Sequence, residues 1–355
     1  MHLVLLIAAY QPDNTLFDII KNSTDIVNNN SELNNSKFSI VVVNDASTKE
    51  ISHQTFALIK SKLPSVIILN RKYNGGQGAS LKTGFSWILE NLKNVDFVVT
   101  ADADGQHLPQ DIISIFNEGI NTNFEFPILG VRHFGKNVPA RSRIGNIVTS
   151  YIVRYLYGCD VKDTQTGLRG FPISYLNALI LKKSNRFNFN SEVLVHLMMN
   201  NHFIQKTITT VYEPGNPSSH FRPIIDSLQI YSIFFKYALV MLSVFLIEFL
   251  NFSILNYYLK DSLTSFASAK FISIIISFLL LKEKVFLSKS YNWRSIIWYF
   301  SLSIFHLFSV WWIFEIFQKY TIISELFSAL ISYLIMFFVV YWVQRKFIFR
   351  TTKKI

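Results

Sequence analysis

The first half of the chain alternates short runs of aliphatic or β-branched residues with longer amphipathic stretches. The short runs predict buried strands, and the amphipathic stretches predict helices. This alternation favours a largely parallel sheet covered on both faces, because each parallel connection needs a crossover helix. The expected strands are 3–9, 38–43, 66–69, 97–101 and 127–131, and the expected helices are 15–28, 49–62, 77–92, 110–118 and 144–157. Residues 173 to 211 are expected to add helices and a strand that complete the domain.

The pattern changes after Ser227, where long apolar segments replace the alternation. Each segment is close to the ~20 residues that a helix needs to cross a bilayer, and the backbone has few other options in lipid. The expected spans are 238–258, 264–281, 296–318 and 323–343. The sequence therefore predicts an α/β domain over 1–227 and an all-helical membrane domain over 228–355.

Composition and charge support a membrane protein. Half of the residues are apolar and 16% are charged, which is too apolar for one ordinary soluble domain. From Leu228 onward, 13 Lys or Arg residues stand against five Asp or Glu, within a net charge of +11 for the whole chain. This positive charge flanks apolar runs, as in membrane proteins, and does not form the polar stripe of a nucleic-acid-binding surface. The single cysteine, Cys159, excludes an intrachain disulfide and a thiolate zinc cluster.

The distribution of basic residues also predicts the topology. Lysines and arginines gather between the second and third expected spans and in the C-terminal tail. The positive-inside rule places both segments in the cytoplasm, and four spans then put the N-terminal domain there too. We expect a multi-pass protein of the cell membrane with its N-terminal domain and both termini in the cytoplasm.

The strongest polar signal follows the fourth expected strand. The segment Thr100-Ala101-Asp102-Ala103-Asp104-Gly105-Gln106 carries two carboxylates at a spacing of two. On extended backbone such residues point to the same side, so both carboxylates and the Gln106 amide are expected to face one point. Hard anionic oxygens in this arrangement suit a divalent cation that also holds a diphosphate. A polar turn before a helix that begins at Pro109 is the alternative interpretation.

Polar residues follow other expected strands too, at the edge where an open α/β sheet binds its ligands. Tyr10 follows the first strand, and Asn44-Asp45 follows the second, where a carboxylate can accept from the ring N–H of a base. An Asx turn explains Asp45 equally well. The segment from Gly75 to Gly78 can approach a ligand closely, although a glycine-rich segment by itself is more often a turn.

Arginines recur in segments that are expected to be loops. Guanidinium groups can hold phosphates through two parallel hydrogen bonds. Each arginine alone is explained as an ordinary surface residue, but four of them after an acidic loop favour a phosphate site. They are Arg132, Arg141, Arg143 and Arg169.

Together these motifs resemble glycosyltransferase family 2, of the dolichyl-phosphate mannose synthase and polyprenyl-phosphate glucosyltransferase type. The resemblance covers about residues 3–227 and implies a GT-A type fold that binds a nucleotide sugar. It rests on an ordered set of segments: Gly76 to Gly84, Asp102 to His107, Asp163 to Arg169 and Ser219 to Arg222. The apolar part resembles the GtrA-like four-helix domain, through Lys284-Val285-Phe286 and Arg345-Lys346-Phe347-Ile348-Phe349 at the ends of its second and fourth spans.

The resemblance implies a role for each matching residue. The metal ligands for Mg²⁺ or Mn²⁺ would be Asp102, Asp104 and Gln106, and the catalytic set would be Asp102, Asp104, Arg132, Arg143, Asp163 and Arg169. The donor would contact Tyr10, Asp13, Asp45, Gly76 and Gly78, and the acceptor phosphate would contact His220 and Arg222. The chain departs from the family at Ala8-Ala9-Tyr10-Gln11-Pro12, where many relatives have Pro-x-Tyr-Asn-Glu. It also carries Asn190 where an acidic residue is expected, with Glu192 two residues on.

The implied activity is transfer of one hexose from a UDP- or GDP-sugar to an undecaprenyl- or dolichyl-type phosphate, for cell-envelope glycan or glycoconjugate synthesis. A phosphate monoester, with a second pKa of roughly 6, is ionised near neutral pH and can attack the anomeric carbon without a general base, which implies inversion. The nearby histidines are therefore expected to be loop residues without a catalytic role: His107, His133 and His220.

Two alternatives remain open. A processive polysaccharide synthase also joins such a domain to membrane helices, but the chain lacks the Gln-x-x-Arg-Trp motif of those enzymes. A non-catalytic lipid-sugar transporter or scaffold is the other, and the intact acidic pair argues against it. The expected partners are a nucleotide sugar, a polyprenyl phosphate and membrane lipid, without nucleic acid, and a homo-oligomer is left open.

Charged residues inside the expected spans lead to a separate hypothesis. Counted at ~1.5 Å per residue, Glu248, Lys270 and His306 lie about 15 to 17 Å from the cytoplasmic ends of their helices. A charge in lipid is costly and is normally paired. We expect Glu248 and Lys270 to approach each other, with His306 as a third member. The alternative is that Lys270 snorkels outward and Glu248 is protonated.

Overall fold

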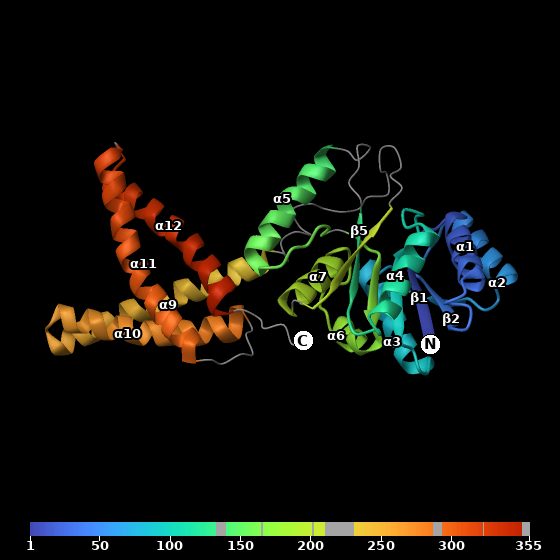
Figure 1. Cartoon of the computed structure of the whole chain (residues 1–355), viewed down its shortest axis with the longest axis horizontal. Helices are drawn as coiled ribbons and strands as arrows, with labels where there is room; N and C mark the ends of the chain where they lie inside the picture. The colour runs from blue at the N-terminus through green and yellow to red at the C-terminus, as the bar shows by residue number, and fades with distance from the viewer. Residues whose placement is uncertain are drawn as a thin grey trace. The chain divides into compact units, whose positions relative to one another are not determined.

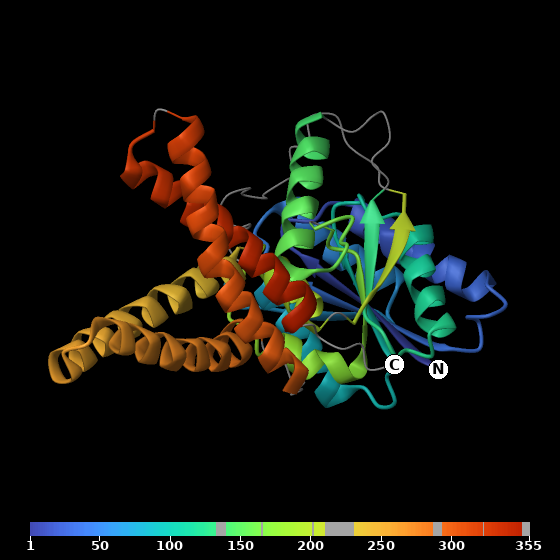
Figure 2. The same cartoon turned by 60° about the vertical axis from the view of Figure 1, so that its left-hand side comes forward.

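The computed structural model describes residues 1–132, 140–164, 166–200, 202–209, 231–286, 293–321 and 323–349, with the backbone alone given for 140–148. The chain divides into two compact units. The α/β unit comprises residues 1–152 and 160–230, and the helical unit comprises residues 153–159 and 231–355. The predicted boundary near Ser227 falls outside the described residues. Figures 1 and 2 show the elements of each unit.

The described part of the α/β unit contains a seven-stranded sheet with the order β3-β2-β1-β4-β6-β5-β7. Strand β6 runs antiparallel to its neighbours β4 and β5, and the other pairs are parallel. This confirms the predicted mostly parallel sheet. The strands are β1 (His2–Ala9), β2 (Lys37–Asn44), β3 (Ile67–Asn70), β4 (Phe97–Asp102), β5 (Ile128–Arg132), β6 (Arg169–Pro172) and β7 (Ile204–Ile208).

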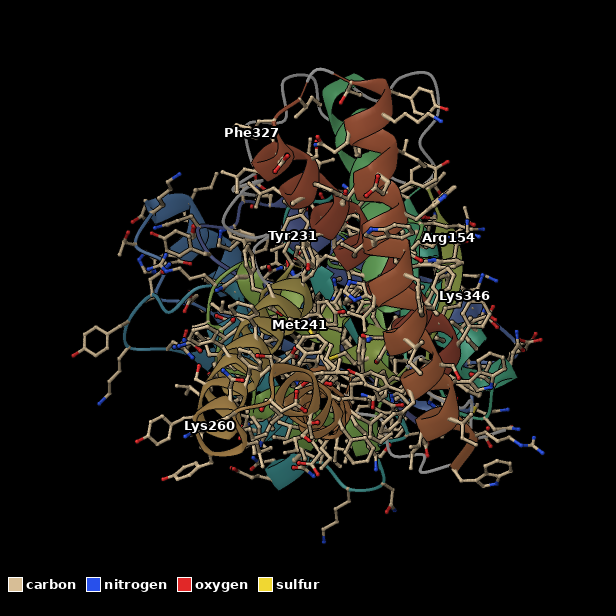
Figure 3. The ribbon with its side chains drawn as sticks, turned by 90° about the vertical axis from the view of Figure 1, so that its left-hand side faces the viewer. Arg154, Tyr231, Met241, Lys260, Phe327 and Lys346 are labelled. Carbon is tan, nitrogen blue, oxygen red and sulfur yellow. The ribbon has the colours of Figure 1, made fainter. Side chains whose placement is uncertain are left out.

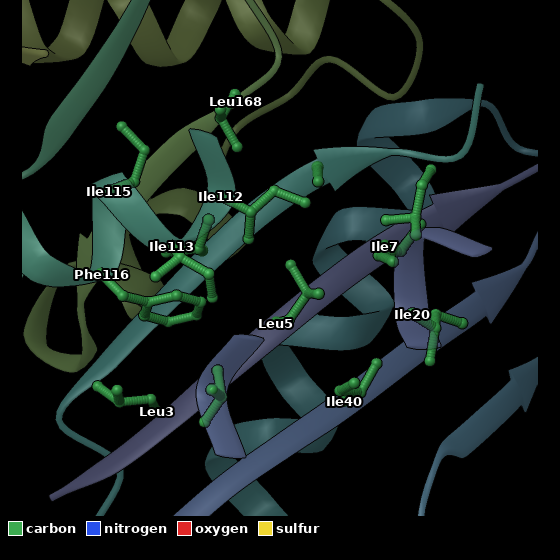
Figure 4. Close-up of a cluster of buried hydrophobic side chains, with 14 of the residues drawn as sticks. Leu3, Leu5, Ile7, Ile20, Ile40, Ile112, Ile113, Ile115, Phe116 and Leu168 are labelled. Atoms are coloured by element: carbon green, nitrogen blue, oxygen red, sulfur yellow. The ribbon is translucent and has the colours of Figure 1, made fainter. Parts of the chain in front are cut away.

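Helices cover both faces of this sheet. Leu3, Leu5 and Ile7 of β1 belong to a core cluster with α1 and α4, as Figure 4 shows. On the other face α3 lies so close that a Cβ on Gly84 would come within 2.3 Å of Leu6. The helices of this unit are α1 (Thr15–Asn29), α2 (Glu50–Lys62), α3 (Gln77–Asn91), α4 (Pro109–Asn121), α5 (Ala140–Tyr157), the 3-10 turn η1 (Ile173–Tyr175), α6 (Leu176–Ile180) and α7 (Asn188–Asn200). The last turn of α5, from Val153 onward, belongs to the helical unit.

The structure differs from the predicted local structure in several places, and Arg132, predicted in a loop, is the last residue of β5. Strand β6 was not expected, because its sequence, Arg-Gly-Phe-Pro, contains a glycine and a proline, which are both uncommon in strands. Arg169 is consequently the first residue of a central strand and not a loop residue. Arg141 and Arg143 lie in α5, which begins at Ala140 and not near residue 144.

The helical unit contains four helices that are long and apolar enough to cross a membrane. Many of their large apolar side chains are exposed in the isolated chain, among them Phe327, labelled in Figure 3, whose exposed fraction is 60%. Such a surface suits lipid and not water. The helices are α9 (Ser232–Leu259), α10 (Ser262–Leu280), α11 (Trp293–Tyr320) and α12 (Glu325–Val343), and π-helical turns extend the second and fourth, η2 (Leu281–Val285) and η3 (Gln344–Ile348).

The predicted pair of intramembrane charges is confirmed. Lys270 Nζ donates to Glu248 Oε1 at 2.8 Å, and Ser273 Oγ donates to Glu248 Oε2 at 2.8 Å. The carboxylate of α9 is therefore held by two donors from α10. His306 has Tyr333 of α12 as a ring neighbour, with 6.4 Å between centroids.

The two sequence signatures of the helical unit meet in one aromatic cluster. The rings of Phe286 and Phe349 stack at 4.9 Å, next to Tyr341 and Tyr299. Each phenylalanine directly follows a π-helical turn. The π-helical turns at the ends of α10 and α12 therefore lie directly before the two phenylalanines that stack on each other.

The last turn of α5 packs against this end of α12. The Tyr341 hydroxyl donates to the Leu156 carbonyl at 2.6 Å. Arg345 donates from Nε and Nη2 to the Tyr157 carbonyl at 3.1 and 2.7 Å. Carbonyls at the end of a helix lack partners within the helix, and these two side chains supply the donors.

Candidate active site

The acidic segment lies where β4 ends. Asp102 is the last residue of β4, and the chain then turns through Gly105, whose φ is +79°. Asp102, Asp104 and Gln106 were predicted to face the same side because they would lie on extended backbone. The extended backbone ends at Asp102, so strand geometry does not determine where Asp104 and Gln106 point. The turn nevertheless brings the two carboxylates into electrostatic contact. Asp104 Oδ1 also accepts from the backbone N–H of Gln106 at 3.1 Å.

Asp102 is partly exposed, and two other segments of the chain contact its carboxylate. Gln77 Nε2 donates to Asp102 Oδ1 at 2.5 Å, and a Cβ on Gly167 would lie 2.5 Å from Asp102 Oδ2. Burial raises the pKa of Asp102 to about 6. Burial, and then the charge of Asp102, raise the pKa of Asp104 as well. Each carboxylate disfavours the ionised form of the other, so a cation bound between them would stabilise both in their ionised forms.

His107 was expected to be a loop histidine, and it lies in the segment between β4 and α4. Its side chain is buried, and its Nδ1 accepts from the backbone N–H of Asp102 at 3.1 Å. Burial lowers the pKa of His107 to about 4, so the ring is neutral near pH 7 and carries its proton on Nε2. His107 therefore supports the acidic turn from within.

Three of the predicted charged residues surround this turn. Arg132, at the end of β5, donates to Asp163 from Nε at 2.6 Å and from Nη2 at 3.0 Å. Arg169 is 1% exposed, and it donates from Nε to the Thr166 carbonyl and from Nη1 to the Asn190 carbonyl. Its Nη2 has no hydrogen-bond partner within the described part of the chain. Burial lowers the pKa of Arg169 to about 10, so it stays protonated at neutral pH.

The predicted nucleoside residues lie at neighbouring strand ends. Tyr10 directly follows β1, and its side chain is 55% exposed. Asp13 Oδ1 accepts from the backbone N–H of Thr15, at the start of α1. Asp45 follows β2 and is buried.

Asp45 uses both carboxylate oxygens within the chain. They accept from the backbone N–H groups of Gly75 at 3.0 Å and Gly76 at 2.7 Å. Arg71 also forms an ion pair with Oδ1 at 2.8 Å. Asp45 therefore holds the glycine segment that leads into α3.

The two predicted donor-binding glycines allow a close approach between α3 and the start of α7. Gly76 has a φ of +88°, and a Cβ on it would lie 2.8 Å from Arg186 Cγ. A Cβ on Gly78 would lie 2.4 Å from Phe189 Cβ. The space that these glycines leave is thus filled by the protein's own residues.

Some predicted site residues cannot be placed. His220 and Arg222 lie outside the described residues, and the side chain of Arg143 is not among those described. Conversely, Gln77 was not predicted to be a site residue, because its only local signal is its position after two glycines at the start of a helix.

The donor set fits a hard divalent cation that is only partly held by protein. Among the described residues, no group of three or more His, Cys, Asp or Glu side chains gathers as a metal site. The acidic turn instead offers two carboxylates. Mg²⁺ is commonly held by one or two carboxylates together with waters and substrate phosphates.

Comparisons with known proteins identify the family of this chain. The model of glycosyl transferase family 2 matches residues 7–183. The UDP-N-acetylglucosamine–dolichyl-phosphate N-acetylglucosaminyltransferase of Methanococcus voltae is 30% identical over 208 residues, which cover 54% of this chain and 78% of that protein. The chain belongs to glycosyl transferase family 2. Its family 2 region therefore includes the acidic turn, Arg132 and Arg169.

Two further proteins are similar to this family 2 glycosyltransferase. The undecaprenyl-phosphate mannosyltransferase of Micrococcus luteus is 30% identical over 122 residues, which cover 33% of this chain and 48% of that protein. A solved mannosyltransferase of Pyrobaculum calidifontis, in complex with GDP-Man and Mn²⁺, aligns with a TM-score of 0.41 at 10% identity, over 97% of this chain and 87% of that one.

Proposed function

We propose that this family 2 glycosyltransferase moves one hexose from a nucleotide sugar to a polyprenyl phosphate at the cytoplasmic face of the membrane, with inversion at the anomeric carbon. The observation that carries the proposal is the paired carboxylates of Asp102 and Asp104 beside the buried Arg169, on a chain that also has four membrane-length apolar helices. Relatives named for dolichyl-phosphate and undecaprenyl-phosphate acceptors support the acceptor class.

The proposed reaction requires the protein to stabilise negative charge and does not require a general base. A phosphate acceptor is already ionised near neutral pH and attacks directly, displacing the nucleoside diphosphate from the opposite face of the sugar. Burial lowers the pKa of His107 to about 4, which makes it a weak base, and this is consistent with a reaction that needs no general base. The difficult step is the departure of the diphosphate, whose negative charge grows in the transition state.

The residues of the site are suited to that step. Asp102, Asp104 and Gln106 would hold Mg²⁺ or Mn²⁺, which when bound would offset charge on the leaving diphosphate. Arg169 keeps a fixed cation beside Asp102, with one N–H group still without a partner among the described residues. His220 and Arg222 remain assigned to the acceptor phosphate by their position before the first span. Tyr10 is assigned to the nucleoside.

The test is transfer by the full-length protein in detergent or liposomes. Labelled UDP- and GDP-hexoses are supplied with undecaprenyl or dolichyl phosphate and with Mg²⁺ or Mn²⁺. We expect one hexose per lipid, with an inverted anomeric configuration. Asp104→Asn should lower turnover by ~10²-fold or more at saturating metal, because it removes one anionic ligand.

The outcomes separate the alternatives. A polymer of sugar would identify a processive synthase. Absence of transfer with every donor and acceptor would favour a scaffold or transporter. Unchanged turnover by Asp104→Asn would remove the metal assignment while leaving the transferase activity intact.

A further inference from the structure

The side chain of Gln77 links Asp102 to a helix that lies far away in the sequence. Gln77 Nε2 donates to Asp102 Oδ1 at 2.5 Å. Its Oε1 accepts from Asn190 Nδ2 at 3.0 Å, across 113 residues of chain. The three side chains come from the start of α3, the end of β4 and the start of α7.

The direction of this relay follows from the chemistry of its ends. An ionised carboxylate only accepts hydrogen bonds, so Gln77 must turn its amide N–H toward Asp102. Its carbonyl then faces Asn190 and needs a donor there. Asparagine provides an N–H donor at this place, whereas an ionised aspartate would not. Asn190 thus selects the orientation of Gln77 that Asp102 requires.

The backbone around Gln77 is held on both sides. Asp45 accepts from the two N–H groups directly before Gln77, at Gly75 and Gly76. On the far side the backbone N–H of Ala79 donates to the Asn185 carbonyl at 2.8 Å. A side chain on such a fixed segment has little freedom to leave Asp102.

Asn190 also contacts the cationic side of the site. Its backbone carbonyl accepts from Arg169 Nη1 at 2.8 Å, while its side chain reaches Gln77. One residue of α7 therefore constrains both the buried Arg169 guanidinium and, through Gln77, the Asp102 carboxylate.

We propose that Gln77 and Asn190 are positioning residues for Asp102, which orient its carboxylate toward a divalent cation. The proposal rests on the proposed function for the identity of the bound cation. The hydrogen bond from Gln77 uses one lone pair of Asp102 Oδ1 and leaves the remaining lone pairs of the carboxylate for a cation. The Gln77 amide is neutral, so it orients the Asp102 carboxylate without repelling the cation. A lysine or arginine at this position would repel the cation. Partners of this kind commonly contribute 10–100-fold to metal affinity.

The test uses Mn²⁺ binding as its primary readout. The full-length protein is titrated with Mn²⁺, with and without UDP or GDP, and bound metal is followed by electron paramagnetic resonance. The variants are Gln77→Met and Asn190→Leu, which keep the approximate shape and the net charge. We expect Mn²⁺ binding to weaken by about 10–100-fold in Gln77→Met and by a smaller factor in Asn190→Leu. Gln54→Met, the same change on an exposed part of α2, is the matched control and should bind Mn²⁺ like the wild type.

A double variant distinguishes positioning from general packing. If Asn190 acts through Gln77, adding Asn190→Leu to Gln77→Met should cause no further loss of Mn²⁺ affinity. Excess Mn²⁺ should also restore most of the turnover of Gln77→Met, because the missing contribution is to metal affinity. A packing defect would give additive losses that metal does not restore.

The results also separate this proposal from the proposed function. Wild-type affinity for Mn²⁺ in Gln77→Met, with sugar transfer intact in the wild type, would overturn the positioning role alone. Weakened Mn²⁺ binding in Gln77→Met, with a wild type that transfers no sugar, would overturn the transferase proposal and support the positioning role. A wild type that binds no Mn²⁺ under any of these conditions would overturn both the metal site and its positioning residues.

Discussion

Two buried arginines show how the same side chain serves different ends in the two units. Arg169 is 1% exposed and lies beside Asp102 and Asp163, with one N–H group that has no partner among the described residues. Arg345 is 5% exposed and directs two N–H groups to a single backbone carbonyl. The first arrangement leaves hydrogen-bonding capacity for a ligand. The second completes the end of a helix.

The role of Arg345 can be tested by removing its side chain. Arg345→Ala leaves the buried Tyr157 carbonyl without these donors, and hydrogen bonds that involve a charged group contribute about 1.5–3 kcal/mol. We expect a lower free energy of unfolding by about that amount, measured as thermal stability in detergent. Lys346→Ala is the control, because Lys346 is the next residue along the chain and its side chain is exposed. Equal stability of the two variants would contradict the capping role.

At the scale of elements, α9 and α10 are joined at a depth where charges are expensive. Glu248 receives donors from Lys270 and Ser273, both on α10. Pairing of this kind specifies which faces of two largely featureless apolar helices meet, since few other polar groups can compete in lipid.

The pair predicts a double-mutant result. Glu248→Gln or Lys270→Met alone should destabilise the protein, by up to about 3–5 kcal/mol in lipid or detergent, because one charge is left uncompensated within an apolar span. The double variant should recover much of the loss. Thermal unfolding in detergent measures all three, with Lys319→Met on the exposed end of α11 as the control. Strictly additive effects would show that the two charges do not depend on each other.

At the scale of the whole molecule, a family 2 domain shares one chain with four apolar helices. A lipid-linked acceptor is confined to the bilayer, so a chain that is itself anchored there meets the acceptor at high effective concentration. The proposed function therefore expects the α/β unit on the cytoplasmic side of the membrane, together with its nucleotide sugar.

Topology can be tested by labelling single cysteines in a Cys159→Ser background that retains activity. The positive-inside rule places the α9–α10 connection outside and the C-terminal tail inside. A membrane-impermeant maleimide should therefore label Lys260→Cys in intact cells. It should label Lys353→Cys only after permeabilisation. The reverse labelling pattern would invert the proposed topology.

The sequence by itself determined the features that depend on local periodicity or on length. Alternating apolar runs predicted β1 to β5 and the helices between them, because burial on a sheet or helix leaves a regular pattern along the chain. The acidic turn was found because strand ends in such sheets gather at one edge. The constant rise of a helix placed Glu248 and Lys270 at one depth, and the structure pairs them.

Only the tertiary structure decided the features that depend on contacts between distant segments. Strand β6 exists because β4 and β5 supply its hydrogen bonds, so four residues with no pattern of their own become central. Gly78 is small because Phe189 fills its space, and Gln77 orients Asp102 because Asn190 holds it from α7. Such contacts depend on how elements pack together, and packing leaves no periodic signal in a single sequence.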